Sequence, residues 1–312
     1  MNLSTSHEQT ILNTLNAVEK KERPEPVCWL DGELMAADQA RIPVLDHGLL
    51  YGDGVFEGIR FYHGRAFRLD EHLRRLRDSA QAIALTLPHS QDALAQAVRA
   101  TIAAYGAPSG YVRLVVTRGS GPLGLDPGPC KQPHVIIIII AAPLQLVDEQ
   151  QRREGIRLII AATRRLPPDG LDPRIKSLNY LNHILARLEA NRAGAQEAIL
   201  LNGAGRVTEG SADNIFCVRR DRLYTPPVTD GALDGITRHC ILELAASLHI
   251  PASEDSLTAF DLYTADEVFL TGTGAELIPV REIDGRRLSA CPGPIFTRLS
   301  AAFQALIAAE PG

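Results

Sequence analysis

One lysine in the sequence stands where an amine could act as a nucleophile. Lys176 closes a short polar segment, and the residues after it predict a helix because apolar side chains recur at helical spacing: Leu181, Ile184, Leu185 and Leu188. The partial positive charge at a helix N-terminus favours the neutral, nucleophilic form of a nearby amine. A solvated surface lysine fits the same local pattern equally well.

A glutamate further along the chain could hold a proton on an aromatic ring nitrogen. Ala198–Leu201, the pair Asn202-Gly203 and Val207 predict a hairpin with Glu209 at its exit. A carboxylate in that place could keep a pyridinium ring protonated and electron-poor. The competing interpretation is an ordinary loop glutamate in a turn rich in Gly and Ser, and the local pattern by itself favours it.

Two turns and one arginine could bind a phosphate. Gly235–Arg238 opens a predicted helix, whose first N–H groups are free to meet an anion. Thr271–Glu276 follows a predicted strand, Glu267–Leu270, and offers hydroxyl and N–H groups. Many helices begin in the first way, and the second turn could equally be a plain corner between a strand and a helix. Arg75 could be a third phosphate ligand, although its own segment favours a charge on a helix surface.

Two predicted strands, over residues 55–62 and 111–117, could form the wall of a pocket. Alternate residues of a strand share a face, which gives two short sets: Phe56, Gly58 and Arg60 on the first strand, and Tyr111 and Arg113 on the second. Aromatic and basic groups together could receive an acid that also has an apolar part. The alternative is a pair of arginines at a sheet edge, held in salt bridges.

The elements around these residues divide the chain into four predicted parts. Residues 1–26 are a polar extension, 27–144 a smaller N-terminal α/β domain, 145–155 an interdomain linker, and 156–312 a larger C-terminal domain. Further elements are predicted as follows: strands at Val27–Leu30, Arg65–Leu69, His134–Ala142 and Ile156–Ala162, and helices capped by Asp70 and covering Ser90–Tyr105. Strands and helices mix without a strict βαβ rhythm, so an α/β (α+β) fold with much antiparallel sheet is expected.

Composition excludes several classes of partner. A net charge of −5 gives no reason to expect nucleic acid or an anionic membrane surface. The run Val135–Ile140 is too short to span a bilayer, and the first residues lack a signal-peptide core. Five scattered cysteines without a C-x-x-C spacing predict no metal site and fit free thiols in a reducing cytoplasm.

Seven segments, taken together, resemble the fold-type IV enzymes that use pyridoxal 5'-phosphate (PLP), and among these the branched-chain amino acid aminotransferases. They occur in the family's order across about residues 27–305: LDHGLLYGDGVFEGIRFY, FRLDEHLRRL, YVRLVVTRG, IKSLNYLN, VTEGSADNIF, LDGITR and ADEVFLTGTGAELIPV. The resemblance implies the two-domain fold of the D-amino acid and branched-chain aminotransferases. The segment around Ile175–Asn179 is shared with the D-amino acid group.

The resemblance also assigns roles to individual residues. Lys176 would form a Schiff base with PLP and act as the catalytic residue, and Glu209 would contact the pyridine nitrogen. Further cofactor ligands would be Arg75, Tyr180, Ile236, Thr237 and Thr273. Gly274 and Ala275 would hold the substrate α-carboxylate. The side-chain pocket would be shaped by Tyr51, Phe56, Gly58, Arg60, Tyr111 and Arg113, with Arg113 meeting the distal carboxylate of glutamate or 2-oxoglutarate.

The implied reaction is transamination between a branched-chain L-amino acid (Leu, Ile or Val) and 2-oxoglutarate, giving a 2-oxo acid and L-glutamate. A homodimer, or a larger assembly of dimers, is expected with it. Three other activities remain open: a D-amino acid or (R)-amine transaminase, an aminodeoxychorismate lyase, and a non-catalytic PLP-binding relative. Intact Lys176, Glu209 and Arg75 argue against the last.

Overall fold

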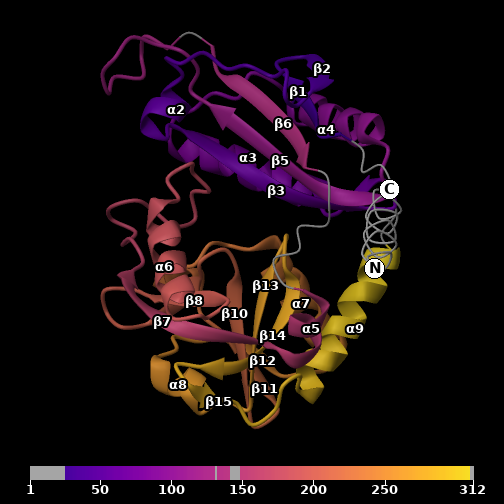
Figure 1. Cartoon of the computed structure of the whole chain (residues 1–312), viewed down its shortest axis with the longest axis vertical. Coiled ribbons are helices and arrows are strands. Elements are labelled where there is room, and N and C mark those ends of the chain that lie inside the picture. Colours follow the sequence, from indigo (N-terminus) through magenta and orange to yellow (C-terminus); the bar gives the residue numbers. More distant parts are fainter. Residues whose placement is uncertain (1–24, 131, 141–147, 310–312) are drawn as a thin grey trace, which may run out of the picture.

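The computed structural model describes residues 25–130, 132–140 and 148–309, and it contains two separate sheets. Figure 1 shows the first sheet, from the N-terminal part of the chain, above the second. The mixed α/β architecture predicted from the sequence is confirmed. The assignment of residues 27–144 and 156–312 to two domains stays a prediction.

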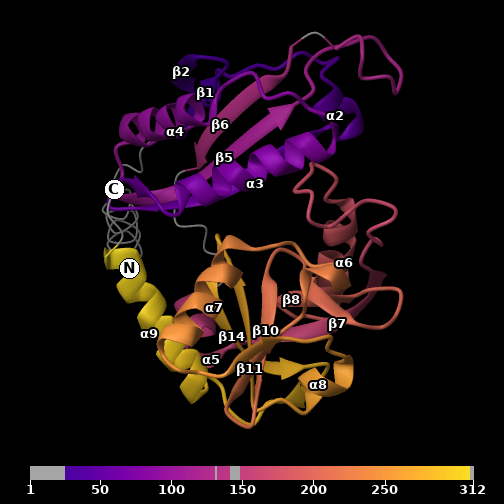
Figure 2. The same cartoon turned by 180° about the vertical axis from the view of Figure 1, so that it is seen from behind.

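The N-terminal sheet is entirely antiparallel, in the order β2-β1-β6-β5-β3-β4. Its strands are β1 (Val27–Leu30), β2 (Glu33–Ala36), β3 (Gly54–Tyr62), β4 (Arg65–Ala66), β5 (Ser109–Thr117) and β6 (His134–Ile140). The accompanying helices are α2 (His47–Tyr51), α3 (Leu69–Ala82) and α4 (Gln91–Tyr105). Figure 2 shows α3 running along this sheet, and its apolar side joins the sheet in one buried core through Leu73, Leu76 and Ala80.

The C-terminal sheet has nine strands in the order β12-β11-β10-β13-β14-β7-β8-β9, with β15 paired to β14. These are β7 (Ile156–Arg164), β8 (Glu197–Leu201), β9 (Val207–Gly210), β10 (Asn214–Arg219), β11 (Arg222–Thr225), β12 (Ala252–Glu254), β13 (Glu267–Gly272), β14 (Glu276–Ile283) and β15 (Arg286–Arg287). The helices of this half are α5 (Glu149–Glu154), α6 (Leu181–Arg192), the 3₁₀ helix η1 (Val228–Asp230), α7 (Ile236–Ser247), α8 (Ala259–Tyr263) and α9 (Pro294–Ala309).

Several predicted boundaries were wrong. Helix α3 begins at Leu69, so Asp70 lies within its first turn and the capping position falls to Arg68, which has no side-chain capping bond. The predicted strand Arg65–Leu69 shortens to the two residues of β4. The turn after β13 leads into another strand, β14, which rules out a strand-to-helix corner. Strand β2 and helix α2 are among the elements that were not predicted.

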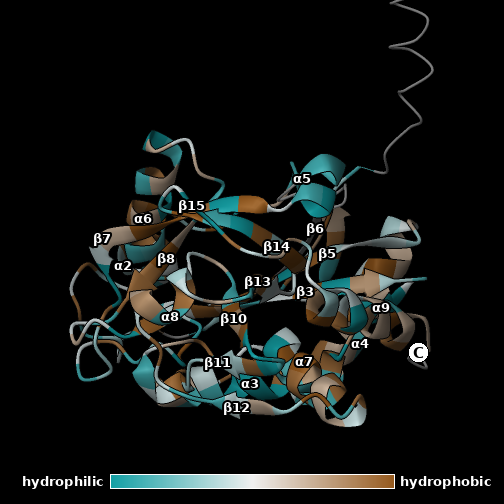
Figure 3. Ribbon diagram, turned by 90° about the horizontal axis from the view of Figure 1, so that it is seen from below, coloured by the Kyte–Doolittle hydropathy of each residue, from teal (hydrophilic) through white to brown (hydrophobic). Residues whose placement is uncertain are grey.

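The predicted linker, residues 145–155, is only partly described. Its last part forms the short helix α5, where Asp148 and Gln151 make a capping box. Figure 3 shows α5 as a hydrophilic helix, which fits its sequence of Glu, Gln and Arg. Residues 145–147, like 1–24 and the predicted strand end at 141–142, lie outside the described residues.

Helix α6 confirms the helix predicted after Lys176, with its apolar row exposed. The apolar row that predicted the helix is exposed: Leu181, Ile184, Leu185 and Leu188 are between 42% and 66% exposed, and Ile184 also lines a cavity. The buried side carries His183, Ala186 and Ala190 instead. Small side chains let α6 pack closely on β7 and β8. The periodicity therefore predicted the helix correctly, and an exposed apolar row of this kind is typical of an interaction surface.

Candidate active site

A cavity of about 570 Å³ lies between the two halves of the molecule. Twelve of the residues predicted for the site line it: Phe56, Gly58, Arg75, Tyr111, Arg113, Lys176, Tyr180, Glu209, Ile236, Thr237, Thr273 and Gly274. They come from both sheets and from segments more than 200 residues apart in the chain. Such convergence of polar groups in one cavity is the usual mark of a binding or active site.

Lys176 is carried by a segment that binds the edge of the N-terminal sheet. The N–H of Phe56 donates to the Lys176 carbonyl at 2.9 Å, and the N–H of Leu178 donates to the Gly54 carbonyl at 3.0 Å. The Lys176 N–H donates to Ser79 Oγ of α3 at 3.1 Å. Its amine, Nζ, lies 3.1 Å from the Tyr180 hydroxyl and 4.6 Å from the centre of the Phe56 ring. The lysine lines the cavity, so the surface interpretation was wrong.

Glu209 lies in β9, near the end of the predicted hairpin, and it is buried. Its Oε2 accepts the N–H of Leu233 at 2.8 Å. Its Oε1 lies 2.9 Å from Nε of Arg165, but that N–H points to the Gly231 carbonyl, and Oε1 has no hydrogen-bond partner. Burial raises the pKa of the Glu209 carboxyl, while the charge of Arg165 opposes the rise. One buried acceptor atom is thus left open on a residue that lines the cavity.

Arg75 is fixed by a two-pronged ion pair with Glu57 of β3. Its Nε donates to Glu57 Oε1 at 2.7 Å, a terminal nitrogen donates to Oε2 at 2.8 Å, and the other reaches the Asp234 carbonyl at 2.8 Å. Burial opposes ionisation of Glu57, but Arg75 and His72 outweigh it and hold the pKa of that carboxyl well below its usual range. The surface interpretation of Arg75 was wrong, because the guanidinium is pre-oriented beside the cavity.

The N-terminus of α7 meets the cavity with unsatisfied N–H groups. Gly235 is its capping residue and offers no side-chain cap, so the amides of Ile236 and Thr237 remain available to an anion. A side chain at position 235 would collide with Asn214, so the close approach requires glycine. The β13–β14 turn adds Thr273 and Gly274 to the lining, and the buried hydroxyl of Thr271 there has no hydrogen-bond partner.

The opposite wall is built by the register of β3 and β5. Gly58 faces Arg113 across the ladder, and Arg60 faces Tyr111, as the alternation predicted. The Arg113 guanidinium lies over the Phe56 ring at 4.3 Å and over the Tyr111 ring at 5.5 Å. A Cβ at Gly58 would collide with the Tyr111 hydroxyl. The absent side chain therefore makes room for the tyrosine on this wall.

Three predicted pocket residues do not line the cavity. Tyr51, at the exposed end of α2, accepts the N–H of Gly124 at 3.0 Å. Arg60 turns to Glu276, with 3.5 Å between a terminal nitrogen and Oε1. Ala275 is buried, and its carbonyl accepts a hydrogen bond from Arg152 of α5 at 3.2 Å.

Two titratable residues that were not predicted also line the cavity. His183 stacks flat on Tyr180, with 4.4 Å between ring centres, and its Nδ1 lies 2.8 Å from the Ser211 carbonyl. Burial lowers the pKa of His183 to about 3, so the ring is neutral. Asp213 is buried beside Glu197, and together burial and that second carboxylate raise its pKa to about 7. In the sequence, Asp213 could have been identified as a candidate because it lies in the segment Ser211–Asn214, just after Glu209.

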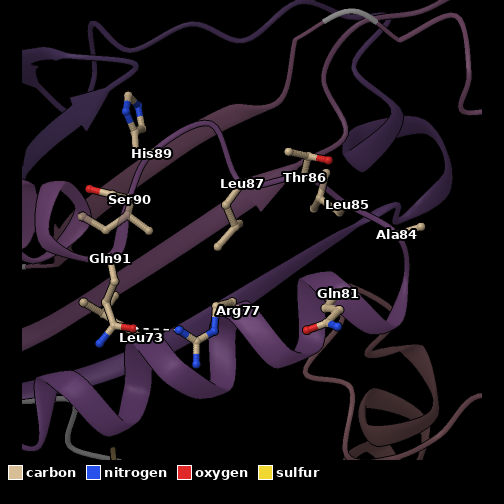
Figure 4. Close-up of a pocket in the computed structure, with 11 residues that line it drawn as sticks. Leu73, Arg77, Gln81, Ala84, Leu85, Thr86, Leu87, His89, Ser90 and Gln91 are labelled. Atoms are coloured by element: carbon tan, nitrogen blue, oxygen red, sulfur yellow. Dashed lines mark hydrogen bonds between the residues drawn. The ribbon is translucent and has the colours of Figure 1, made fainter.

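A second cavity, of about 480 Å³, lies between α3 and the start of α4 (Figure 4). Arg77 donates to Gln91 Oε1 there at 3.3 Å, and the remaining lining mixes leucines with polar residues. None of the residues predicted for chemistry lies in it. The cavity around Lys176 is therefore the candidate active site.

Other classes of site find no support in the described part of the chain. No group of three or more His, Cys, Asp or Glu residues there could hold a metal ion. None of the helices in those ranges combines the length and apolarity needed to cross a bilayer.

Comparison with known proteins gives a consistent result. The family model described as amino-transferase class IV matches residues 54–283. A Methanocaldococcus jannaschii protein, provisionally named a branched-chain-amino-acid aminotransferase, is 49% identical over 258 residues, which cover 83% of this chain and 88% of that protein. The crystal structure of the Escherichia coli branched-chain amino acid aminotransferase has a TM-score of 0.87 and 36% identity, covering 90% of this chain and 94% of that one.

A further solved structure bears on the ligand. It is a branched-chain amino acid aminotransferase, here called the T.th. enzyme after the abbreviated name of its source, complexed with N-(5'-phosphopyridoxyl)-L-glutamate. It has a TM-score of 0.84 and 34% identity, and the match covers 90% of this chain and 93% of that one. The relative's ligand joins a phosphopyridoxyl group to glutamate in one molecule.

Proposed function

The chain belongs to the aminotransferase class IV family, and from this premise we propose that it is a PLP-dependent aminotransferase that exchanges the amino group of a branched-chain L-amino acid with 2-oxoglutarate. The products are the 2-oxo acid and L-glutamate. One observation carries the proposal: Lys176 and the open Oε1 of Glu209 share a cavity with a set of anion-binding groups.

The residues of the cavity fit PLP by their chemistry. Oε1 of Glu209 has the Arg165 charge beside it but accepts no hydrogen bond from the described residues, so it can accept one from a protonated pyridine nitrogen. Arg75, the first amides of α7 and Thr273 supply donors for a phosphate. The Lys176 amine is placed for attachment to an aldehyde, beside the Tyr180 hydroxyl. When bound, PLP supplies an electron sink for the carbon–hydrogen bond next to the amino group.

Lys176 then has a second task, which is to move a proton. Its Nζ takes the proton from the substrate Cα in one half-reaction and returns it in the other. The Tyr180 hydroxyl, 3.1 Å away, and the Phe56 ring restrict where the amine can lie. Glu209 holds the ring nitrogen protonated, with Arg165 favouring its ionised form. Gly274 and Ala275 are the proposed binding place of the substrate α-carboxylate.

The side-chain preference follows from the β3–β5 wall. Phe56, Gly58 and Tyr111 offer an apolar and aromatic surface to an alkyl chain. The Arg113 guanidinium, stacked on Phe56, can receive the distal carboxylate of glutamate. The names of the similar enzymes and the phosphopyridoxyl-glutamate bound by the T.th. enzyme support both halves of this proposal.

A homodimer is part of the proposal, with the exposed apolar row of α6 in its interface. Figures 1 and 2 place α2 and α6 on the same side of the molecule, and α2 also exposes Leu49, Leu50 and Tyr51. Tyr51, which is absent from its own cavity's lining, would then serve the partner's site.

The oligomeric state tests this part of the proposal. Leu185→Glu should convert the dimer to monomer in sedimentation velocity, because a charge would be buried in an apolar interface. The matched control is Ala305→Glu, an exposed position on α9, which both figures place on the other side of the molecule from α6. A dimer that persists in Leu185→Glu would contradict the proposed interface.

The proposed location is the cytoplasm, where the five free thiols stay reduced.

A substrate panel tests the proposed reaction directly. Purified protein with added PLP is given L- and D-amino acids and simple amines, each with 2-oxoglutarate or pyruvate as acceptor. The proposal expects the fastest turnover with L-leucine, L-isoleucine or L-valine and 2-oxoglutarate. Activity confined to D-amino acids or amines would contradict the substrate proposal, and a protein that binds no PLP would contradict the chemistry.

A further inference from the structure

Two arginines belong to the β3–β5 wall, and their surroundings differ. Arg113 lines the cavity and stacks on aromatic rings, and within residues 25–130, 132–140 and 148–309 no carboxylate pairs with it. Arg60 stands opposite Tyr111, one step further along the wall, and pairs with Glu276. The wall therefore holds one paired and one unpaired guanidinium.

We propose that Glu276 is a specificity-determining residue: by neutralising Arg60, it leaves Arg113 as the single wall arginine offered to the second carboxylate of a dicarboxylic substrate. This inference rests on the proposed aminotransferase function and deepens it. An alkyl substrate has no group that could satisfy an unpaired guanidinium, so a second one beside the pocket would disfavour it. One paired and one unpaired arginine let a single pocket serve both kinds of substrate.

Glu276 is held firmly enough to do this. The Tyr62 hydroxyl donates to its Oε1 at 2.8 Å, and Gln304 of α9 donates to its Oε2 at 3.0 Å. The Arg60 and Glu276 side chains are 11% and 15% exposed, so water and salt screen their charges weakly. Tyr62 and Arg60 lie on the same face of β3. The carboxylate is thus fastened from the N-terminal sheet and from α9 at once.

Glu276 has an unusual backbone conformation and adjoins the residues proposed to bind the substrate. Its φ of +59° lies in the left-handed region, which costs free energy for a residue other than glycine. Glu276 directly follows Gly274 and Ala275, the residues proposed to bind the α-carboxylate. In the other member of the ion pair, Arg60, the Nε atom is buried without a hydrogen-bond partner. Glu276 is therefore the residue on which neutralisation of Arg60 depends.

Two unreactive acids separate charge from catalysis. Glutarate has two carboxylates, 4-methylvalerate has one carboxylate and a branched alkyl end, and neither carries an amino or oxo group. Calorimetry gives the Kd of each acid for the PLP-saturated protein. In Glu276→Gln the preference for glutarate over 4-methylvalerate should rise roughly fivefold, because the Arg60 charge becomes unpaired near the pocket.

A second variant and a double variant complete the test. Arg60→Gln should lower the glutarate preference by a similar factor, because the carboxylate of Glu276 then stands uncompensated. The double variant should return to within about twofold of the wild-type preference. If Glu276→Gln fails to fold, Arg60→Gln decides by itself.

Two results would overturn the inference: equal weakening of both acids in Glu276→Gln, which indicates that the residue only supports the turn, or an unchanged preference in Arg60→Gln. The proposed function is judged separately. If the wild-type protein transaminates L-leucine and the preferences do not move, the inference alone fails. If it does not transaminate any amino acid and the preferences move as expected, the proposed function fails.

Discussion

The two walls of the cavity are built in different ways. One wall carries Lys176 and Glu209 as single groups, each placed by backbone hydrogen bonds: the Lys176 segment is bonded to β3, and Glu209 accepts the N–H of Leu233. On the N-terminal side, the wall is a strand face, where Phe56, Gly58 and Arg113 owe their places to the register of β3 and β5. This difference indicates that the first wall fixes the chemistry and the second fixes the preference among substrates. Substitutions in the two walls should accordingly fail in different ways.

The largest effect is expected at Lys176. In Lys176→Ala turnover should fall by at least about 10³-fold, because no other lysine of the described ranges lines the cavity and could move the Cα proton. The absorbance band of the lysine-bound cofactor should disappear with it. The matched control is Arg174→Ala, two residues away on the exposed side of the same segment, which should keep both. Steady-state kinetics and the absorbance spectrum measure this, and retained turnover in Lys176→Ala would sink the mechanism.

Glu209→Gln should lower kcat by about 10²-fold, since the amide has nearly the same shape but cannot stabilise a protonated ring nitrogen. The melting temperature should fall as well, because the buried Arg165 guanidinium, 2.9 Å from Oε1, loses its counter-charge. The measurement pairs kcat for L-leucine with the absorbance maximum of bound PLP. A variant with full kcat would show that the open Oε1 is not a cofactor contact.

On the other wall, Gly58→Ala should act on binding. The added methyl group meets the Tyr111 hydroxyl, so the tyrosine must move into the space of the substrate side chain. The KM for L-leucine should rise about tenfold, with PLP affinity unchanged. The control is Ser109→Ala, at the far end of β5. Gly64→Ala, in the turn beyond β3, would not serve, because the positive φ of Gly64 strains any other residue. Loss of PLP binding in Gly58→Ala would mean that the walls are not separable in this way.

The sequence identified the groups of the first wall as candidates, and the structure brings them to one cavity. The local sequence patterns around Lys176 and Glu209 were each weak evidence for a site. The ordered segments that resemble one enzyme family identified both residues together. The family assignment is confirmed by the matching model and relatives. The roles of the individual residues remain predictions, supported by their convergence in one cavity.

Other features depended on contacts that lie far apart in the sequence. Arg75 looks like a surface charge in its helix, and only Glu57 on β3 and the Asp234 carbonyl explain its burial. The apolar row of α6 predicted a helix but not its buried side, which is formed by His183 and small alanines. Tyr51 and Arg60 matched a family pattern, but the pattern does not specify which side chains reach the cavity of the same chain. Periodicity predicts that a helix exists and leaves its partner open.

Two buried carboxyls near the cavity should also differ in how they respond to pH. Glu57, on β3, has a lowered pKa, so its ion pair with Arg75 stabilises the fold above its unfolded pKa and is lost as the pH falls. The pKa of Asp213 is shifted in the opposite direction. Its pKa is raised to about 7 by burial and by Glu197, so the folded state binds more protons than the unfolded chain between the ordinary value of 3.8 and 7. Stability from this group therefore decreases as the pH rises through that window.

The smallest predicted effect follows from that sign. Asp213→Asn removes the titration, so the melting temperature of the variant minus that of the wild type should increase from pH 5 to pH 8 by roughly a few degrees. Asp169→Asn, an exposed residue before α6, serves as the control for losing one negative charge and should show no such trend. Thermal unfolding followed by circular dichroism at several pH values measures both. A constant or shrinking difference for Asp213→Asn would show that Asp213 is ionised in the folded protein throughout this range. In that case the C-terminal wall would hold its second buried carboxylate charged, and Glu209 would share the cavity with a permanent negative neighbour.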